Sequence, residues 1–445
     1  MSLRFGTDGV RGAAGSELSP ELVLALGRAA AAVLGGSEFV VGRDTRLSGP
    51  MLQAALSAGI AAEGLDVVDI GVAPTPAVAA VAAARGVAAA VISASHNPYH
   101  DNGIKLLAPG GLKLNDDEEQ QIERAVAARS AVASGAPPAI GRLRSDDEAI
   151  PWYCRRVVDS LGGRRVDGIR VVVDCANGAA TPTAERILAQ AGADVVHVIA
   201  AQPDGTNINE RCGSTDPSLL AESVRAHGAD VGLALDGDAD RVIAVDEHGE
   251  IVDGDRLLAM FAVDLRERDR LAGNTLVVTV MSNLGLQKAM EDAGVRVHRT
   301  AVGDRNVLEA LDGNGWSLGG EQSGHIIFRE LATTGDGVLS GLLLLDLLRR
   351  SGRKLSELAA ESMVSMPQVL RNVEIPPGSP PISDSARLSN EIRAVEDELG
   401  TGGRVVLRAS GTEPLVRVMV EAQTEHAAAS AAQRLVDAVE EAARG

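Results

Sequence analysis

The feature that most limits the fold of this 445-residue chain is a repeated alternation of short apolar segments with Ala-rich helical segments. Ser19 and Pro20 mark the start of a first helix, which stops at Gly35 and Gly36. The expected elements that follow are a strand at Glu38–Val41, a helix that Ser48 caps and that runs to Ala62, a strand at Asp66–Ile70, a helix at Thr75–Ala84 and a strand at Ala88–Ile92. Such alternation is typical of α/β sheets with mainly parallel strands.

The alternation returns twice and then changes character toward the C-terminus. The second unit is expected to contain Ile169–Val173, Thr181–Gly192, Val195–Ile199, Pro217–Gly228 and Val231–Leu235, and the third Thr275–Met281, Leu284–Gly294, Val295–Thr300, Arg305–Leu311 and Ser317–Gly319. Beyond the proline-rich stretch Pro376–Pro381, strands at Arg404–Arg408 and Leu415–Glu421 precede an amphipathic helix at Glu425–Ala443. We therefore predict an α/β fold. Three similar α/β domains with mixed, mainly parallel sheets would occupy residues 1–150, 151–250 and 251–365, and a smaller C-terminal α+β domain residues 366–445.

Composition and charge argue against nucleic-acid binding and membrane insertion. Lys and Arg number 42 against 61 Asp and Glu, so a net charge of −19 repels phosphate backbones and anionic membranes, and aromatic residues make up only 2%. The most apolar helical stretch, Leu339–Leu348, has about ten residues, far short of the roughly 20 that span a bilayer. No apolar segment follows Met1, and Cys154, Cys175 and Cys212 form no closely spaced pair. We therefore expect a soluble protein of the reducing cytoplasm.

A candidate nucleophile follows the strand expected at Ala88–Ile92. Ser95 lies in the segment Ser93–Pro98, SASHNP, and ligands of α/β sheets gather beyond the carboxyl ends of strands. The segment does not match the G-x-S-x-G turn of hydrolases. A hydroxyl-rich turn that satisfies its own backbone is the alternative interpretation of these residues.

Three carboxylates follow another apolar strand, Val231–Leu235. Asp236, Asp238 and Asp240 alternate in DGDADR, so they lie on one face of an extended segment, where their like charges require a cation. Oxygen ligands in a compact set suit Mg²⁺. A calcium-binding EF-hand loop does not fit, because Arg241 stands where that loop requires Gly. A solvated acidic turn remains the alternative.

A loop near the C-terminus offers donors for a phosphate group. Ser410, Gly411 and Thr412 lie between Arg408 and Arg417 in the sequence. Hydroxyls, an open backbone and guanidinium groups are the donors that a phosphate monoester needs. A Ser-Gly-Thr turn between two strands can also be purely structural.

A further loop, GEQSGH, offers groups that can bind sugar hydroxyls. Glu321 is an acceptor, Ser323 carries a hydroxyl and His325 has a titratable ring. His325 can equally be a structural histidine with its bonds satisfied. The remaining histidines are assigned no role.

Basic residues also follow turns and strands near the N-terminus. Arg11 lies in FGTDGVRG, and Arg43 and Arg46 lie in GRDTR. In a chain of strong negative charge, arginines at such positions predict a local anion site.

Taken together, these motifs resemble those of a known enzyme family. SASHNP, DGDADR, GEQSGH and RASGTEP, in this order and at these separations, are similar to the four active-site loops of the α-D-phosphohexomutases, and the resemblance extends from Phe5 to Arg417. Within the family, FGTDGVRG, TVMSNLGL, AVGDRNV and Gln322 most resemble the bacterial phosphoglucosamine mutases. Relatives that act on glucose or mannose phosphates usually carry Met where Gln322 stands. The resemblance implies four domains around a central cleft.

The resemblance also implies a set of site residues. Ser95 would carry a phosphoryl group, and Ser95 with Asp236, Asp238 and Asp240 would hold one Mg²⁺ ion. Substrate would be bound by Glu321 and Ser323 at the sugar and by Arg408, Ser410, Gly411, Thr412 and Arg417 at the distal phosphate. Arg11, Lys105 and Arg241 would offset phosphate charge, and proton transfer would fall to Lys105 or His325.

The reaction that the resemblance implies is the interconversion of glucosamine 6-phosphate and glucosamine 1-phosphate through a bisphosphorylated sugar. Glucosamine or glucose 1,6-bisphosphate would serve as activator, and the product would feed UDP-N-acetylglucosamine and cell-wall precursors. The expected partner is a small sugar phosphate, and the chain is expected to be a monomer or a homodimer. The alternatives are a phosphomannomutase/phosphoglucomutase, a sugar-phosphate sensor without catalysis, and an aspartyl-phosphate phosphatase with Asp236 as nucleophile. Against the phosphatase, Asp240 stands where its motif has Thr or Val.

Overall fold

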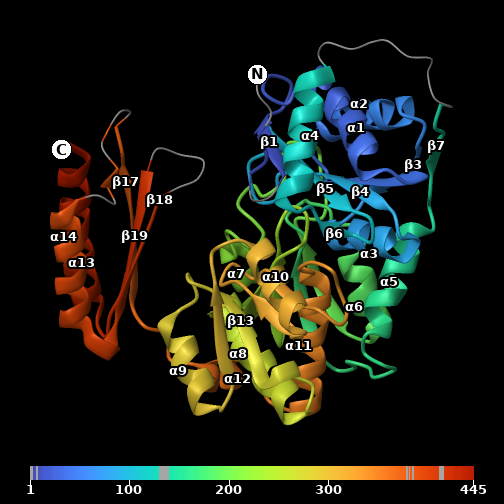
Figure 1. Cartoon of the computed structure of the whole chain (residues 1–445). Coiled ribbons are helices and arrows are strands. Elements are labelled where there is room, and N and C mark those ends of the chain that lie inside the picture. Colours follow the sequence, from blue (N-terminus) through green and yellow to red (C-terminus); the bar gives the residue numbers. More distant parts are fainter. Residues whose placement is uncertain are drawn as a thin grey trace.

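The described residues form four sheets, each accompanied by helices (Figure 1). The computed structural model describes residues 4–6, 9–129, 140–376, 379, 381–382, 385–409 and 415–444. The predicted class, three α/β units with mixed, mainly parallel sheets and a smaller C-terminal unit, is confirmed.

The first sheet collects the N-terminal strands. In spatial order they are β1 (Val10–Ala13), β5 (Asp101–Ala108), β4 (Ala88–Ile92), β2 (Glu38–Arg43), β3 (Asp66–Val72) and β7 (Leu143–Ser145), with β6 (Leu112–Lys113) paired to β5. The helices of this unit are α1 (Pro20–Leu34), α2 (Gly49–Ala62), α3 (Thr75–Arg85) and α4 (Asp116–Arg129). Strands β2, β3, β4 and β7 run parallel, and β5 returns antiparallel to β4. All of β4 is buried, as its continuous apolar sequence predicts.

The second and third sheets repeat this plan with fewer strands. The second contains, in spatial order, β12 (Ile251–Val252), β11 (Val242–Asp246), β10 (Val231–Leu235), β8 (Arg170–Asp174) and β9 (Asp194–Ile199), with helices α6 (Ala184–Ala191) and α7 (Ser218–His227). The third contains β14 (Arg296–Thr300), β13 (Thr275–Thr279), β15 (Leu318–Gly320) and β16 (Ile326–Phe328). Its helices are α8 (Gly254–Glu267), α9 (Leu284–Asp292), α10 (Asp304–Asn314), α11 (Gly337–Ser351) and α12 (Leu355–Ser362), with a short 3₁₀ turn, η1 (Ala272–Asn274). Helix α5 (Ala149–Asp159) packs against α3 and α6 and so links the first two units.

The C-terminal unit is an antiparallel sheet covered by two helices. Its strands, in spatial order, are β17 (Gln368–Glu374), β19 (Leu415–Glu421) and β18 (Arg404–Ala409), and its helices are α13 (Ala386–Leu399) and α14 (Glu425–Arg444), with the 3₁₀ turn η3 (Gly400–Gly402). In Figure 1 the sheet lies between these helices and the rest of the molecule. Polar contacts join it to α9, where Glu421 accepts the Leu284 N–H at 3.1 Å and pairs with Arg404.

The apolar cores show which units are bound to one another. One continuous cluster runs from Val40 and Val91 in the first sheet through Ile187 in α6 to Leu276 and Leu345 in the third unit. The C-terminal unit has a core of its own. Burial of apolar surface therefore ties the first three units together, whereas the fourth packs independently.

Two local expectations need correction. Ser19 caps α1 as predicted, accepting the Leu22 N–H, but the Ser48 hydroxyl makes no cap bond and instead accepts a bond from Asn102 at 2.8 Å. Helix α6 begins at Ala184 rather than at Thr181, because the Thr181 hydroxyl bonds the Gly178 carbonyl and holds a turn there.

Among the helices of the described residues, none combines the length and apolar character of a membrane span.

Candidate active site

The loop after β4 holds Ser95 in a buried and strained position. Ser95 is 1% exposed, and its φ of 53° is a left-handed conformation that costs a non-glycine residue about 1–3 kcal/mol. Its N–H donates to Ser93 Oγ at 3.0 Å, and the Ser93 hydroxyl donates to Asp44 at 2.6 Å. Strain of this kind persists only where the surroundings fix the residue, which is typical of functional sites.

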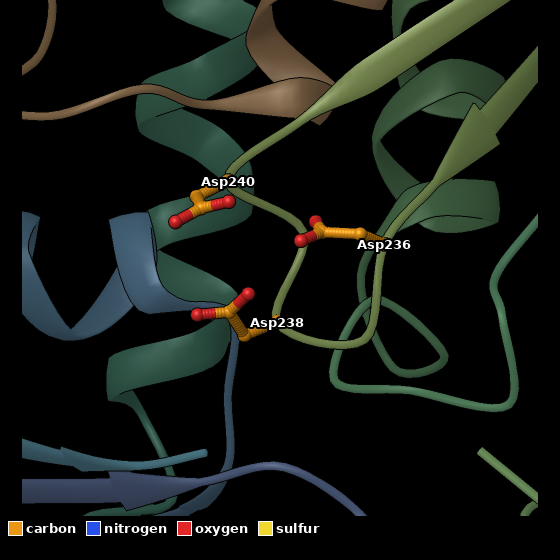
Figure 2. A group of neighbouring side chains, drawn as sticks. All are labelled: Asp236, Asp238 and Asp240. Atoms are coloured by element: carbon orange, nitrogen blue, oxygen red, sulfur yellow. The ribbon is translucent and has the colours of Figure 1, made fainter. Parts of the chain in front are cut away.

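The loop between β10 and β11 carries the three predicted carboxylates. Asp236, Asp238 and Asp240 are all buried, and one oxygen of each lies within 4.8 Å of the others. Figure 2 shows the three side chains turned toward a common space beside their loop. Ser95 Oγ donates to Asp236 Oδ2 at 2.6 Å, so the candidate nucleophile of the first unit meets the acidic cluster of the second.

This close approach depends on a glycine. A Cβ at Gly237 would lie 2.3 Å from the Ser95 carbonyl oxygen, a distance that no side chain tolerates. The glycine between the first two aspartates therefore lets the acidic loop reach the Ser95 loop.

Positive charges surround the acidic cluster. Lys105 on β5 places Nζ 2.7 Å from Asp238 Oδ2 and 3.3 Å from Asp240 Oδ2. Arg241 Nε lies 3.8 Å from Asp240 Oδ1. Arg11 on β1 lies opposite Gly103 on β5. Gly103 is two residues before Lys105, so the strand pairing brings Arg11 close to the acidic cluster as well.

The acidic cluster fits a divalent cation. Burial and the charges of Asp240 and Asp238 raise the pKa of Asp236 well above its ordinary value, whereas Lys105 and His325 outweigh burial and hold the pKa of Asp240 well below that value. Within the described part of the chain, Asp238 Oδ1 and Asp240 Oδ1 are buried and accept no hydrogen bond. Buried carboxylate oxygens without donors need a positive partner, and a compact set of oxygens suits Mg²⁺.

His96 is a functional candidate that sequence reasoning misses. Its Nδ1 lies 3.2 Å from Ser95 Oγ and 3.4 Å from Arg241 Nη1. Burial, followed by the charges of Arg241 and Arg11, lowers the pKa of His96 to about 4, so the ring is neutral near pH 7. The sequence signal that could have identified His96 is its position directly after Ser95.

The loop between β15 and β16 brings His325 to the acidic cluster. His325 Nδ1 lies 3.7 Å from Asp240 Oδ1, and its Nε2 accepts the Gly335 N–H at 3.1 Å. Nε2 also lies 3.5 Å from Asp304 Oδ2. Because Nε2 accepts a backbone bond, the proton of the neutral ring resides on Nδ1, facing Asp240.

The same loop presents the predicted sugar-binding groups. Glu321 accepts the Gly303 N–H at 3.1 Å, which orients its carboxylate. Ser323 Oγ is buried and, among the described residues, has no hydrogen-bond partner. The amide of Gln322 lies 3.4 Å from Asp253, which caps α8. The loop therefore offers an oriented acceptor and an unused hydroxyl.

The predicted phosphate-binding arginines lie together on the C-terminal sheet. Arg408 on β18 is directly opposite Arg417 on β19, so both side chains lie on one face. Val416 and Val418 point into the helix-covered core, so Arg417 lies on the opposite face. Figure 1 shows that this open face is turned toward the other units. Ser410, Gly411 and Thr412 lie outside the described residues.

The expectation that Arg46 binds an anion is wrong. Arg46 is 1% exposed, its Nε donates to Asp44 at 2.8 Å, and its Nη atoms donate to backbone carbonyls of the Ser95 loop. Arg43 instead lines a hollow between α2 and β7, beside Asp69. The guanidinium of Arg46 therefore donates its hydrogen bonds within the protein, and Asp44, two residues earlier, neutralises its charge.

Two supports come from distant parts of the chain and carry no sequence signal. The Thr75 hydroxyl at the start of α3 donates to Asp238 Oδ2 at 2.5 Å. Asn209, in the loop after β9, donates from Nδ2 to the Ser95 carbonyl at 2.8 Å. Both contacts arise from the packing of the first unit against the second.

Comparison with known protein families gives an ordered match along the chain. The phosphoglucomutase/phosphomannomutase alpha/beta/alpha domains I, II and III match residues 2–133, 153–249 and 253–366, and the C-terminal domain of that family matches residues 370–438.

Full-length relatives are similar as well. The phosphoglucosamine mutase of Desulforudis audaxviator is 52% identical over 447 residues, covering 99% of this chain and 98% of the relative. That of Thermobifida fusca is 51% identical with the same coverage. Among solved structures, a phosphoglucomutase/phosphomannomutase family protein from Burkholderia thailandensis has a TM-score of 0.82 at 27% identity, covering 99% of this chain and 98% of that one. Aspergillus fumigatus N-acetylphosphoglucosamine mutase, solved with GlcNAc-6P and magnesium, shares the fold with a TM-score of 0.70 at 20% identity, covering 99% and 96%.

Proposed function

Because this chain belongs to the phosphoglucomutase/phosphomannomutase family, we propose that it interconverts glucosamine 6-phosphate and glucosamine 1-phosphate through a bisphosphorylated sugar. Full-length relatives about half identical to it carry the name phosphoglucosamine mutase, which supports the amino-sugar substrate. The product would feed UDP-N-acetylglucosamine synthesis in the cytoplasm, where the three buried, unpaired cysteines would stay reduced.

The observation that carries this proposal is the contact between Ser95 and the acidic cluster. The Ser95 hydroxyl is 2.6 Å from Asp236, and Asp238 and Asp240 complete a compact group of buried carboxylates. We propose that Ser95 carries the transferable phosphoryl group and that it and the three carboxylates hold one Mg²⁺ ion. When bound, Mg²⁺ supplies positive charge that offsets the charge on the phosphoryl group during transfer.

The protein residues then guide one transfer in each direction. A sugar hydroxyl oxygen bonds to the Ser95 phosphorus as the bond from phosphorus to Oγ breaks, and the hydroxyl proton passes to a base. His96, neutral near pH 7, is placed to hydrogen-bond Ser95 Oγ as it leaves and again as it attacks in the reverse transfer. Arg241 and Arg11 would offset negative charge around the phosphoryl group.

Between the two candidate bases, we favour Lys105. Both ring nitrogens of His325 face protein groups, since Nε2 accepts the Gly335 N–H and Nδ1 faces Asp240. Lys105 Nζ is also paired, with Asp238 and Asp240 at 2.7 and 3.3 Å, but its four-carbon side chain lets the amine turn toward a sugar hydroxyl. His325 would then orient Asp240.

Substrate binding would involve all four domains, each giving one loop. We assign one loop to each domain. The phosphoserine loop belongs to domain I (residues 1–150), the metal loop to domain II (151–250), the sugar loop to domain III (251–365) and the phosphate loop to domain IV (366–445). Glu321 and Ser323 would bind the sugar hydroxyls. The distal phosphate would bind Arg408, Ser410, Gly411, Thr412 and Arg417.

A coupled assay tests the proposal. Purified protein with Mg²⁺ and glucose 1,6-bisphosphate as activator is given glucosamine, glucose or mannose 6-phosphate, and formation of each 1-phosphate is measured. We expect the highest kcat/KM for glucosamine 6-phosphate and no turnover by Ser95→Ala. Intact-mass and fragment spectra should place one phosphate on Ser95.

Each alternative function predicts a different result. A higher kcat/KM for glucose or mannose phosphate would indicate a phosphoglucomutase or phosphomannomutase. Phosphate on Asp236, with release of inorganic phosphate, would indicate the aspartyl-phosphate phosphatase. Binding without turnover would indicate a sensor.

A further inference from the structure

The strained backbone of Ser95 needs support from outside its own loop. Its φ of 53° is unfavourable for a side chain with a Cβ, so the segment after β4 would relax toward a different conformation if nothing opposed it. Relaxation would turn the Ser95 hydroxyl away from Asp236, 2.6 Å from it in the folded protein. The groups that hold the loop therefore set the position of the reacting oxygen.

Two carbonyl groups of the loop are held by the same two donors. Arg46 Nη2 donates to the Ser95 and Asn97 carbonyls at 2.8 Å each. Asn209 Nδ2 donates to the same two carbonyls at 2.8 and 3.1 Å. One donor belongs to the first unit and the other to the second, so the loop is held from both sides.

Arg46 is a fixed support within the first unit. It is fully buried and paired with Asp44, which also accepts the Ser93 hydroxyl. Loss of either member of this buried pair would leave a charge without a partner and would disturb folding.

Asn209 is a support of a different kind. It is a neutral, half-buried side chain in a loop of the second unit, and its own φ of 58° suits an Asn better than most residues. The Asn209 N–H donates to the Ala176 carbonyl, so the second unit fixes the loop that carries the amide.

We propose that Asn209 is a positioning residue for phosphoryl transfer, which holds Ser95 in its strained conformation and makes the nucleophile depend on the second unit. The inference rests on the proposed function of Ser95. Asn209 acts through the Ser95 backbone and lies outside the sugar-binding and phosphate-binding loops. Its loss should lower the rate of transfer and leave the KM for sugar phosphate unchanged, because small displacements of reacting groups reduce rates steeply.

Two variants of Asn209 separate the amide from the backbone. Asn209→Asp keeps the size and the tolerance of a positive φ, but its carboxylate cannot donate to the two carbonyls. Asn209→Gly keeps the backbone conformation without strain and removes the side chain. The matched control is Glu210→Gln, which alters the exposed neighbouring residue.

The test is a single-turnover measurement on the full-length protein. Unphosphorylated enzyme with Mg²⁺ is mixed with glucose 1,6-bisphosphate, and intact mass follows phosphate transfer to Ser95, while the steady-state assay gives kcat and KM. We expect both Asn209 variants to transfer phosphate about 10- to 100-fold more slowly, with KM within about twofold of wild type. Glu210→Gln should match wild type, and thermal unfolding gives the folded fraction for correcting each rate.

The outcomes distinguish this inference from the proposed function. Transfer at the wild-type rate by folded Asn209→Gly and Asn209→Asp would show that Asn209 only supports the fold and would overturn the positioning role alone. A raised KM with unchanged transfer would overturn it too, by placing Asn209 in substrate binding. Wild-type protein that accepts no phosphate on Ser95 would overturn the proposed function and the positioning role together.

Discussion

Asp238 uses its two carboxylate oxygens differently. Oδ2 accepts the Thr75 hydroxyl at 2.5 Å and lies 2.7 Å from Lys105 Nζ, whereas Oδ1 accepts no hydrogen bond in the described part of the chain. We expect Oδ1 to face the metal. Asp238→Asn removes the charge at constant size, so Mg²⁺ affinity should fall and the rate should fall about 10²-fold or more.

Titration of activity and of binding heat with Mg²⁺ measures the Asp238 effect. Asp147→Asn, which changes an exposed aspartate, is the control and should behave as wild type. Activity that survives removal of metal by EDTA, together with a fully active Asp238→Asn, would show that the acidic cluster has no catalytic metal.

The residues of the site were predictable where they follow a strand directly. Ser95 and the aspartates stand just beyond buried apolar strands, and the carboxyl ends of such strands are where α/β sheets gather their ligands. Asn209 was not predictable, because its contact with Ser95 spans 114 residues and depends on how two units pack. Arg46 misled the interpretation, since only the folded chain shows that Asp44 neutralises it internally.

Among the structural elements, the turn between β10 and β11 has a strict size limit. A Cβ at Gly237 would lie 2.3 Å from the Ser95 carbonyl oxygen and 3.0 Å from the Asn209 amide. We expect Gly237→Ala to push the acidic loop away from Ser95, lowering the rate at least tenfold and the free energy of unfolding by about 1–3 kcal/mol.

Steady-state kinetics and urea unfolding check the Gly237 prediction. Gly163→Ala is a useful comparison: unlike Gly237, a Cβ at Gly163 would meet nothing within 4 Å, but the backbone there has a φ of +84°, so this variant reports backbone strain without crowding. A Gly237→Ala enzyme with wild-type activity would mean that the two loops can separate without loss.

The start of α8 contains a carboxyl that should make stability depend on pH. Asp255 is fully buried, accepts the Asn283 N–H at 2.7 Å, and burial raises its pKa from 3.8 to about 7. The folded state thus binds this proton more tightly than the unfolded state. Protonation of Asp255 therefore stabilises the fold fully below about pH 4. This stabilisation, a few kcal/mol in the free energy of unfolding, is lost as pH rises through 7.

Urea unfolding at pH values from 5 to 8.5 measures this effect. We expect the wild type to lose stability relative to Asp255→Asn as pH rises through 7, because the amide carries no charge to bury. Curves of the two proteins that stay parallel over this range would contradict a raised pKa for Asp255.

At the level of elements, the parallel strands were easier to predict than the antiparallel ones. Buried strands such as β4 and β10 have continuous apolar sequences between clear turns. Strand β5 begins with Asp101, Asn102 and Gly103, which resemble a loop, and only pairing with β1 makes these residues part of a strand. Tertiary pairing overrides local preference there.

At the scale of the whole molecule, we expect the C-terminal unit, which has its own core, to contribute residues that bind the substrate. Arg417 lies on the open face of the C-terminal sheet. Arg417→Ala removes a charge-assisted bond worth about 1.5–3 kcal/mol, so KM for the sugar phosphate should rise roughly 10- to 150-fold with a smaller change in kcat.

Arg371→Ala is the matched control for Arg417. Arg371 is exposed on the neighbouring strand and pairs with Val418, so it lies on the other face of the same sheet. Steady-state kinetics should show an unchanged KM for this variant. An unchanged KM in Arg417→Ala would remove Arg417 from the phosphate site.

The continuous core of the first three units bears on how such a chain can vary over evolutionary time. Separation of any two of these units would expose residues such as Ile187, Leu276 and Leu345 to water. The free-energy cost is about 25 cal/mol for each Å² of apolar surface exposed. We therefore expect the C-terminal unit to vary as a block, whereas changes in the first three units must preserve the core that they share. Sequence change should accordingly accumulate faster in the C-terminal unit than around the nucleophile.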